Sequence, residues 1–481
     1  MSDRLELTWY GKDRRLLSHG DDRYEWVDPT DWRVSEIRLL HDVDTVGDPD
    51  SGNLLIHGDA MHALDALIHI PHLAARYEGK VKLVYIDPPF NTGQAFTHYD
   101  DNLEHSVWLT LLRDRLTQIQ RLLAPDGSVW VHLDDVEQHR ARCVLDEVFG
   151  AENFVATVIW QKRYSRSNDA SFSVAHDYLL VYRSTPAWSR SGRLSRGADA
   201  QYSNPDDDPN GPWRGVPWDA PEERKGLDYP IVTPMGDVKR PPKGRHWSGT
   251  EANWQAVVAE GRDYYGKAGS GMPNVKRYLS EMPGLVPHTI WGHEEVGHND
   301  EATKETQALS PSGSAFATPK PERLLERVIH IGSDPGDIVL DCFAGSGTTA
   351  AVAHKMGRRW LTVEVSGETV STFLRPRLEM VVNGKDPGGI TTVETPTGEG
   401  LPDGVKAGEA KAAAKALAAF QKAGALEEVD GLDEAAVKAA VKALRAAEKT
   451  TSEVRWEGGG GFTHVEVGPS MFEDVDGIIV M

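Results

Sequence analysis

Two short segments, each at the end of an apolar run, carry residues whose types could do chemistry. The first is Asp87-Pro88-Pro89-Phe90, which follows the apolar run Val81–Ile86. Prolines stiffen a turn and leave carbonyl oxygens without a neighbouring N–H donor. An aspartate and such a carbonyl can together accept both hydrogens of an exocyclic amine, and Phe90 can stack on the base that carries it. The alternative is an ordinary proline turn with one exposed aromatic ring.

The second segment is Asp341-Cys342-Phe343-Ala344-Gly345-Ser346-Gly347-Thr348, which leads from an apolar run into a predicted helix. Glycines let the backbone approach a ligand closely, and a helix N-terminus offers free N–H groups. Glu364 ends the next predicted strand about twenty residues later, where an acid can hydrogen-bond ribose hydroxyls. These features favour a nucleotide-like cofactor site, with an ordinary tight turn as the alternative. The P-loop is excluded because Gly-x-x-x-x-Gly-Lys is missing.

Alternating strands and helices must position both segments. Such alternation predicts an α/β fold with a parallel or mixed sheet. Apolar runs and helical spacing predict strands over residues 53–57, 81–86, 128–133, 154–160, 178–182, 337–340 and 360–363, and helices over residues 60–70, 104–123, 136–149, 322–331 and 346–356.

The stretch 184–290 breaks this pattern. It is dense in Pro, Gly, Trp, Tyr and Arg and too long for a loop, which predicts a small irregular domain. The 481 residues carry a net charge of -21, which disfavours a protein that coats nucleic acid over its whole surface. Residues 161–280, however, hold 18 basic and 14 acidic residues, so a polyanion is best placed there. A neutral globular insert is the alternative.

The ends of the chain and the remaining composition complete the prediction. Residues 1–50 form an acidic N-terminal arm, residues 384–405 a linker, and residues 406–481 a helical C-terminal region whose Gly-rich tail is expected to add edge strands. Two cysteines, Cys143 and Cys342, fit a reducing compartment. With no signal pattern and no long apolar run, the expected location is cytoplasmic, without a membrane partner. No Cys/His cluster has metal-ligand spacing, so no metal is expected.

Taken together, the two segments resemble the motifs of the DNA amino-methyltransferases that use S-adenosylmethionine. The catalytic tetrapeptide of that family matches residues 87–90, and its Phe-x-Gly-x-Gly loop matches residues 343–347. The catalytic motif precedes the cofactor loop, the order of the β class. Longer matches at residues 85–93, 127–135, 320–321 and 340–350 resemble the modification subunits of type III restriction systems.

The resemblance implies a Rossmann-like, seven-stranded and mostly parallel methyltransferase sheet. Its catalytic half would span residues 51–183 and its cofactor half residues 291–383, with a target-recognition domain inserted over residues 184–290. Pro88, Pro89 and Phe90 would form the catalytic site with Asp87, which would also touch the cofactor. The other cofactor-binding positions implied are Asp59, Asn91, Ala317, Thr318, Lys320, Asp341, Phe343, Ala344, Gly345, Ser346, Gly347, Thr348 and Glu364. Lys320 would pair with the carboxylate of the methionine part.

The implied reaction is methyl transfer to the N6 amine of adenine in duplex DNA, after the base has been flipped out of the helix. N4-methylation of cytosine, RNA or protein as substrate, and a silent DNA-binding relative are the alternatives. Implied partners are duplex DNA, a second copy of the chain, and a restriction or other defence-system subunit. Arginines are better candidates for DNA contacts than tryptophans, most of which are expected in the core of the small domain. The basic candidates are Arg163, Arg166, Arg214, Lys239, Arg240, Lys243 and Arg245.

Overall fold

A computed structural model describes most of the chain, and the statements below concern those residues. They are residues 6–18, 23–91, 104–166, 171–188, 192–194, 202–309, 316–396, 407–422, 434–445, 450–475 and 478–480. By internal contacts the chain divides into two compact units, residues 1–192 with 288–481, and residues 193–287.

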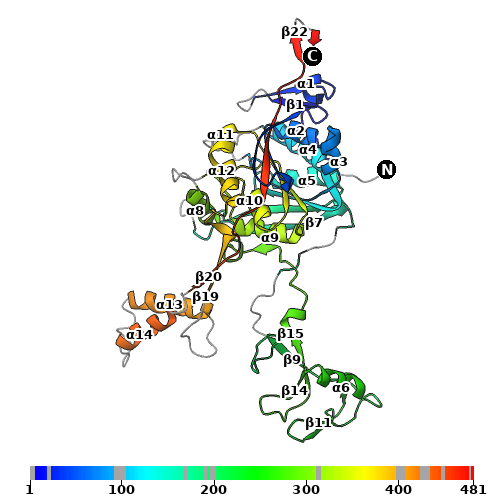
Figure 1. Cartoon of the computed structure of the whole chain (residues 1–481), viewed down its shortest axis with the longest axis vertical. Coiled ribbons are helices and arrows are strands. Elements are labelled where there is room, and N and C mark those ends of the chain that lie inside the picture. Colours follow the sequence, from blue (N-terminus) through cyan, green and yellow to red (C-terminus); the bar gives the residue numbers. More distant parts are fainter. Residues whose placement is uncertain are drawn as a thin grey trace. The chain divides into compact units, whose positions relative to one another are not determined.

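A ten-stranded sheet organises the first unit (Figure 1). Six of its nine neighbouring pairs are parallel, and β8 and β3 run antiparallel to their neighbours. The strands, in spatial order, are β16 (Ile290–Trp291), β7 (Phe154–Gln161), β8 (His176–Arg183), β6 (Leu123–Leu133), β5 (Val81–Ile86), β17 (Ile338–Asp341), β18 (Arg359–Glu364), β4 (Leu54–His57), β21 (Gly461–Val467) and β3 (Leu40–Gly47).

The seven predicted strands are all present and contiguous, from β7 to β4. Strands buried on both faces need apolar side chains on both, and the runs of β5 and β17 are buried almost throughout. The expected count of seven is nevertheless too low for the whole sheet. Strands β16, β21 and β3 come from segments whose short or alternating patterns do not read as buried strands.

Helices cover both faces of this sheet (Figure 1). The helices α2 to α5 pack over one large core with Ile86, Leu340 and Val363. On the other face α9 reaches Leu83 and α10 packs on β17 and β18. The first group comprises α2 (Ala60–His69), α3 (Pro71–Tyr77), α4 (His105–Leu122) and α5 (Gln138–Phe149), and the second comprises α7 (His293–Val296), α8 (Asn299–Leu309), α9 (Glu322–Gly332), α10 (Thr348–Lys355), α11 (Gly367–Thr369) and α12 (Arg375–Val382).

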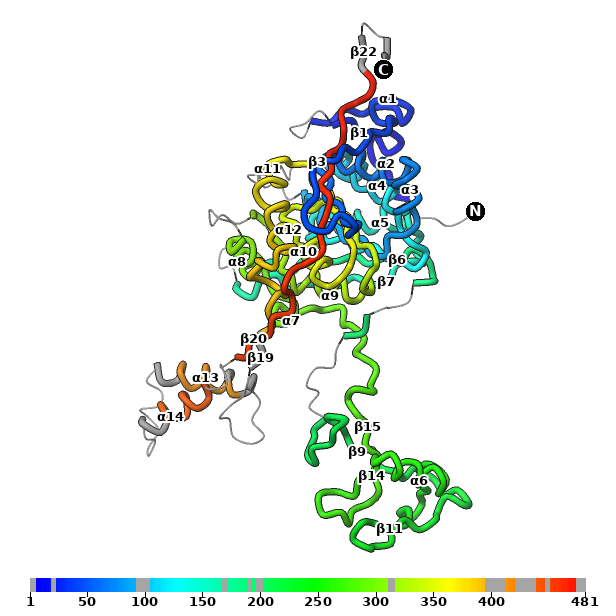
Figure 2. The backbone as a smooth tube through the Cα atoms, in the orientation of Figure 1, coloured from blue at the N-terminus to red at the C-terminus, as the bar shows by residue number. Residues whose placement is uncertain are grey.

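Strand β21 lies inside the sheet, between β4 and β3, so the expectation of an edge strand is wrong. Figure 2 shows the C-terminal segment, in red, passing beside β3. Asn53 joins it to the rest of the sheet. The Asn53 Nδ2 donates to the Gly461 carbonyl at 2.9 Å, and its Oδ1 accepts from the Trp360 N–H at 2.9 Å. Phe462 and Val465 are buried there, which makes the Gly-rich tail part of the core.

Smaller elements flank the sheet at both ends of the chain. On the N-terminal side β1 (Arg15–Ser18) pairs with β2 (Tyr24–Val27), ahead of α1 (Trp32–Ser35). The expected linker contains β19 (Thr392–Pro396), which pairs with β20 (Thr450–Val454). The expected C-terminal helices are α13 (Ala407–Lys422) and α14 (Glu434–Arg445), followed at the end by β22 (Glu473–Val475) and β23 (Ile478–Val480). No helix in the described part is both long and apolar enough to cross a bilayer.

The second unit, residues 193–287, is built from short strands and one helix, α6 (Glu251–Ala259). Trp247 and Trp254 are buried at its centre with Ile231, and Trp213 is buried as well. The expectation that tryptophans form the core of this domain is confirmed. Its strands are β9 (Trp213–Pro217), β10 (Asp219–Pro221), β11 (Ile231–Val232), β12 (Val238–Lys239), β13 (Arg245–Trp247), β14 (Asp263–Tyr264) and β15 (Asn274–Tyr278).

Candidate functional site

Four neighbouring parallel strands end at the same edge of the sheet. Each strand either ends in an acidic residue of the predicted site or is closely followed by one. Asp87 follows β5, Asp341 ends β17, Glu364 ends β18, and Asp59 stands two residues beyond β4. Carboxyl ends of adjacent parallel strands form the usual ligand crevice of an open α/β sheet. Two segments more than 250 residues apart in sequence thus meet at one edge.

The catalytic segment is held by contacts on both sides of Asp87. The Trp108 indole donates to the Pro89 carbonyl at 2.6 Å and so fixes the turn. Asp87 Oδ2 accepts from the Lys320 ammonium, whereas Asp87 Oδ1 is buried and has no hydrogen-bond partner among the described residues. A buried carboxylate oxygen with no partner is costly unless a ligand supplies a donor.

Lys320 therefore reaches Asp87, a contact that the sequence did not suggest. Its ammonium also lies 5.2 Å from the centroid of the Phe90 ring, within range of a cation–π interaction. The expected pairing with a methionine carboxylate remains a prediction. Lys320 thus contacts both the Asp87 carboxyl group and the Phe90 ring.

The glycine loop is braced by the two carboxyl groups that frame it. Asp341 Oδ1 accepts from the Phe343 N–H at 3.0 Å and its Oδ2 accepts from the Thr349 hydroxyl at 2.6 Å. Glu364 Oε2 accepts from the Gly345 N–H at 2.8 Å. Gly347 has φ 79°, and a Cβ at this position would lie 2.4 Å from Leu374. The loop thus requires glycine for its conformation and for its close packing.

Burial changes the proton affinity of both carboxyl groups. Burial raises the pKa of Asp341 to about 7, although the hydrogen bonds from Thr349 and Phe343 oppose the rise. Burial likewise raises the pKa of Glu364 against the backbone N–H donors that favour its ionised form. Buried carboxyl groups at the ends of strands are suited to accept hydrogen bonds from the hydroxyl groups of a ligand in a site with little water.

Two predicted cofactor residues have structural partners instead. Asp59 caps α2 by accepting from the Met61 N–H at 2.7 Å, although it also faces the cavity. The side chain of Asn91, whose φ is 61°, donates to Glu137 at 2.8 Å. Glu137 is fully buried and also binds Arg140 at 3.0 Å and His105. It holds the catalytic turn in a left-handed conformation that is rare outside glycine.

A buried polar chain behind Phe90 was also missed by the sequence analysis. The Tyr85 hydroxyl lies 2.7 Å from His132 Nδ1, and His132 Nε2 lies 3.4 Å from Asp177. Lys162 donates to Asp177 at 2.5 Å, and burial lowers the pKa of His132. The His132 ring lies 5.8 Å from the Phe90 ring at an interplanar angle of 30°. The only signal in the sequence was a polar residue inside an apolar strand.

These groups share one cavity of about 980 Å³. It is large enough for a nucleoside-sized ligand with space for a planar base beside it. Among the predicted catalytic and cofactor-binding residues, Gly347 and Asn91 are not part of its lining. The predicted residues that line it are Asp59, Asp87, Pro88, Pro89, Phe90, Arg163, Ala317, Thr318, Lys320, Asp341, Phe343, Ala344, Gly345, Ser346, Thr348 and Glu364.

The basic residues predicted to contact DNA fall in both units. Arg163 and Arg166 are exposed in the first unit, and Arg163 lines the cavity. In the second unit Arg245 is occupied by an ion pair with Asp219, and Lys239 lies 3.7 Å from Asp237. The remaining three, Arg214, Arg240 and Lys243, are exposed.

Comparison with known proteins gives relatives that are named as DNA methyltransferases or as Mod subunits of restriction-modification enzymes. The chain is 32% identical over 335 residues to the StyLTI Mod subunit, a type III restriction-modification enzyme of Salmonella typhimurium, which covers 63% of this chain and 49% of that protein. It is 40% identical over 322 residues to the DNA adenine methyltransferase YhdJ of Escherichia coli, which covers 67% of this chain and 81% of that protein. The chain thus spans about half the length of the StyLTI subunit, and likewise of the HindVI Mod subunit of Haemophilus influenzae.

Among solved structures, the PvuII DNA methyltransferase (cytosine-N4-specific) matches with a TM-score of 0.39 and 14% identity, over 82% of this chain and 93% of that one. The Rossmann-like α/β fold is assigned from the strand order above. The family model for DNA methylases of the N6/N4 methyltransferase type matches residues 81–375, more than half of the chain. The match includes both the catalytic turn and the glycine loop, and the chain belongs to this family.

Proposed function

We propose that the protein transfers a methyl group from S-adenosylmethionine to the N6 amine of adenine in duplex DNA. The observation that carries the proposal is the buried Asp87 Oδ1, which has no hydrogen-bond partner among the described residues and belongs to a side chain that lines the cavity shared with the glycine loop. A carboxylate oxygen held there by Lys320 is a ready acceptor for an amine hydrogen.

The residues of the loop fit the proposed cofactor. Glu364 and Asp341 each hold the loop with hydrogen bonds, and both line the cavity at the point where ribose hydroxyls could reach them. Gly345 has φ 50°, and a Cβ there would lie 3.2 Å from the Phe316 ring, so a side chain would crowd this part of the cavity. When bound, S-adenosylmethionine supplies an electrophilic methyl group on a positively charged sulfur.

The chain itself would prepare the amine for attack. Asp87 Oδ1 accepts one amine hydrogen and the Pro88 carbonyl accepts the other, which favours a more tetrahedral nitrogen with a more available lone pair. The growing positive charge on that nitrogen is stabilised by Asp87. Phe90, backed by the His132 ring, gives the flipped base a surface to stack on. No covalent bond to the protein is required.

The choice of adenine rests on the relatives. YhdJ is named as a DNA adenine methyltransferase, and the family model spans both N6 and N4 chemistry. The test is to incubate duplex DNA with the protein and methyl-labelled S-adenosylmethionine, digest the DNA to nucleosides and identify the product. N6-methyladenine is expected. N4-methylcytosine alone would overturn the choice of base, and methylation of RNA in preference to DNA would overturn the substrate class.

Asp87→Asn is the variant that tests the mechanism, since it keeps the shape and removes the charge. It is expected to lose nearly all methyl transfer while the fold is kept. Asp126→Asn is the matched control, because Asp126 is half exposed and, among the residues that the structure describes, forms an ion pair only with Lys82 on the same sheet. Transfer that persists unchanged in Asp87→Asn would contradict the assigned role.

We infer further that the protein acts in a restriction-modification or other defence system. The StyLTI and HindVI relatives are named as Mod subunits of type III restriction-modification enzymes. The partner would then be a DNA-cutting subunit, with a second copy of this chain in the same assembly. Mass measurement of the protein purified from its native cells would test both: a monomer without companions contradicts this assignment and leaves the methyl transfer reaction intact.

A further inference from the structure

A cluster of buried ions lies behind the glycine loop, outside the cavity. Glu322 at the start of α9, Lys355 at the end of α10 and Arg377 on α12 have side chains only 1–2% exposed. Lys355 Nζ lies 2.7 Å from Glu322 and 2.6 Å from Asp386, and Arg377 Nη2 lies 2.8 Å from Glu322. Burying charges is expensive, so such a cluster persists only where each charge is paired.

The charges of this cluster balance at neutral pH. Two cations face the carboxylates of Glu322 and Asp386, and the coulombic attraction of Lys355 and Arg377 lowers the pKa of Glu322 against its burial. A third acid, Glu305 on α8, accepts from the Glu322 N–H at 3.0 Å. Burial raises the pKa of Glu305 to about 8, so this group stays protonated and adds no charge.

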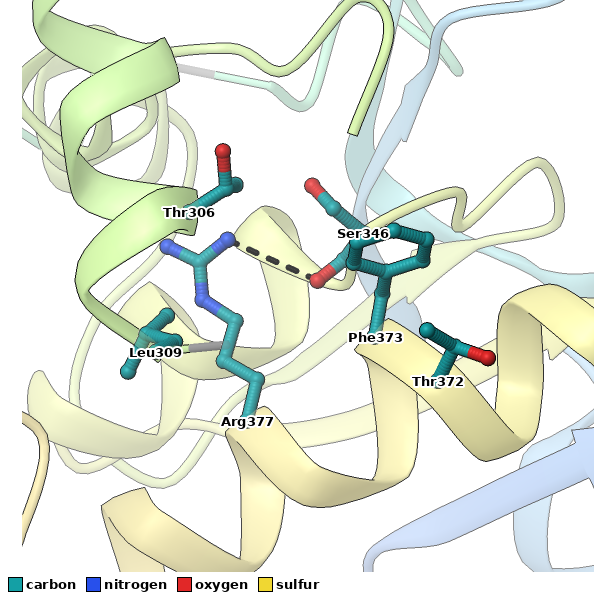
Figure 3. A pocket seen from close by; sticks show the side chains of 6 residues that line it. All are labelled: Thr306, Leu309, Ser346, Thr372, Phe373 and Arg377. Carbon is teal, nitrogen blue, oxygen red and sulfur yellow. Dashed lines mark hydrogen bonds between the residues drawn. The ribbon is translucent and has the colours of Figure 1, made fainter. Parts of the chain in front are cut away.

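Arg377 connects this cluster to the glycine loop. Its Nη1 donates to the Thr348 hydroxyl at 2.8 Å. The same nitrogen lies 3.5 Å from the Ser346 carbonyl, the contact that is drawn as a dashed line in Figure 3. The same guanidinium therefore binds Glu322 with one nitrogen and the loop with the other. The planar fork of arginine can make both contacts at once, whereas a lysine ammonium is a single point.

Glu322 connects the cluster to the catalytic side as well. It stands two residues after Lys320, whose ammonium binds Asp87. Glu322 Oε2 also accepts from the Ile390 N–H at 2.9 Å, so both of its oxygens are fully used. Because α9 starts at Glu322, the position of this residue fixes both the Lys320 segment and, through Arg377, the loop residues 346–348.

We propose that Arg377 is a positioning residue that sets the glycine loop against the Lys320 segment and thereby determines the affinity for S-adenosylmethionine. The proposal rests on the proposed function, because it concerns the same cofactor site. Arg377 is not in the lining of the cavity and does not touch the reacting atoms. Its effect is exerted through the Thr348 hydroxyl and the Ser346 carbonyl.

The test measures the binding of S-adenosylmethionine to the full chain by calorimetry, without any methyl acceptor. Arg377→Lys keeps the buried charge but cannot bind Glu322 and Thr348 together, and it is expected to raise the dissociation constant about 10- to 100-fold. The matched control is Arg375→Gln, two residues away on the same helix. Arg375 pairs with Asp44 and Glu379 rather than with the loop, so its variant should bind as the wild type does.

A second readout separates positioning from general loss of stability. Hydrogen exchange of the protein without ligand should rise over residues 343–349 in Arg377→Lys and stay unchanged in the remaining sheet. The Thr348→Val variant and the double variant complete a cycle: if Arg377 acts through Thr348, the two effects are less than additive.

The outcomes distinguish this proposal from the proposed function. A wild-type protein that does not bind S-adenosylmethionine contradicts the proposed function. A wild type that binds, with a folded Arg377→Lys that binds equally well and shows unchanged exchange in the loop, overturns the positioning role alone. Equal weakening by Arg375→Gln would also overturn it, because a change at an arginine of α12 that does not contact the loop would then suffice.

Discussion

The protein environment raises the pKa of the Asp341 carboxyl group, which is ionised at neutral pH in an unfolded chain. Burial raises its pKa from 3.8 to about 7, so the folded protein holds a proton that the unfolded chain releases. The contribution of Asp341 to the free energy of unfolding should therefore fall as the pH rises from about 4 to about 7. Asp341→Asn should remove about 2–4 kcal/mol of that fall from the pH dependence of the protein, measured by denaturant titration at several pH values.

A smaller fall of the unfolding free energy with rising pH should remain in the same variant. The pKa of Glu305 is raised to about 8, mainly by burial, so it contributes a slope of the same sign. An unchanged dependence on pH would show that Asp341 is ionised in the folded protein.

The contacts of Glu137 predict an effect of this residue on the rate of methyl transfer. Its carboxylate holds the Asn91 side chain at 2.8 Å and thereby the turn that follows Phe90. Glu137→Gln should lower kcat for methyl transfer about tenfold, because small displacements of catalytic groups are costly. The affinity for S-adenosylmethionine should change little. Glu379→Gln, which removes a partly exposed carboxylate from an i,i+4 pair on α12, is the control for steady-state kinetics.

At the scale of elements, the turn from β17 into α10 requires glycine at position 347 for two reasons. Its φ of 79° is strained for other residues, and a Cβ would meet Leu374 at 2.4 Å. Gly357, at the end of α10, has a similar φ of 72° but open space around it. Gly357→Ala should therefore cost about 1 kcal/mol of unfolding free energy, and Gly347→Ala clearly more, with weaker cofactor binding.

Comparison of these two alanine variants isolates the effect of the contact from that of the backbone. Chemical denaturation gives the difference directly, since both sites lie in the same unit. If both variants lose the same stability, Leu374 yields to the added methyl group, and the loop is less tightly packed than the distances indicate.

Asn53 joins three strands that are far apart in sequence. Asn53→Ala would remove the side-chain partner of both the Trp360 N–H and the Gly461 carbonyl. The expected loss is about 2–3 kcal/mol, by thermal or denaturant unfolding. Asn383→Ala, which removes an exposed side chain bonded only within α12, should cost much less. Similar losses for the two variants would show that Asn53 is replaced by water.

Apolar patterning predicted the seven central strands because a strand buried on both faces must be apolar along its length. The same rule placed β21 at an edge of the sheet, because two polar residues separate Phe462 from Val465. His464 and Thr463 read as solvent-facing, although His464 is 5% exposed. Glu137, His132 and Arg377 were missed for a related reason. Each is a polar residue whose partners come from distant segments, and no local pattern shows that pairing.

For the whole molecule, the distribution of charge predicts how DNA binding responds to salt. The chain carries -21 in total, while residues 161–280 stand at +4, so phosphate contacts should be few and local. The dissociation constant for duplex DNA should rise with salt between about 50 and 200 mM. Lys243→Gln should lower the slope of this dependence by about one, whereas Arg121→Gln, in an ion pair with Glu78, should leave it unchanged.

Filter binding or fluorescence anisotropy over a salt series measures that slope. A dissociation constant that does not change with salt would contradict phosphate contacts altogether. A slope altered equally by Lys243→Gln and Arg121→Gln would mean that the exposed cations of the second unit have no special part in DNA binding.

The position of β21 has a consequence for how the protein is made. Asn53 and Gly461, which bind each other in the finished sheet, are 408 residues apart in the chain. A nascent chain on the ribosome has therefore produced every residue of the catalytic turn and the glycine loop before β4 gains this neighbour. Until then the edge of β4 stays open. A premature stop or a frameshift anywhere before residue 461 would leave that edge unprotected, and such products should be removed by proteases or aggregate instead of methylating DNA.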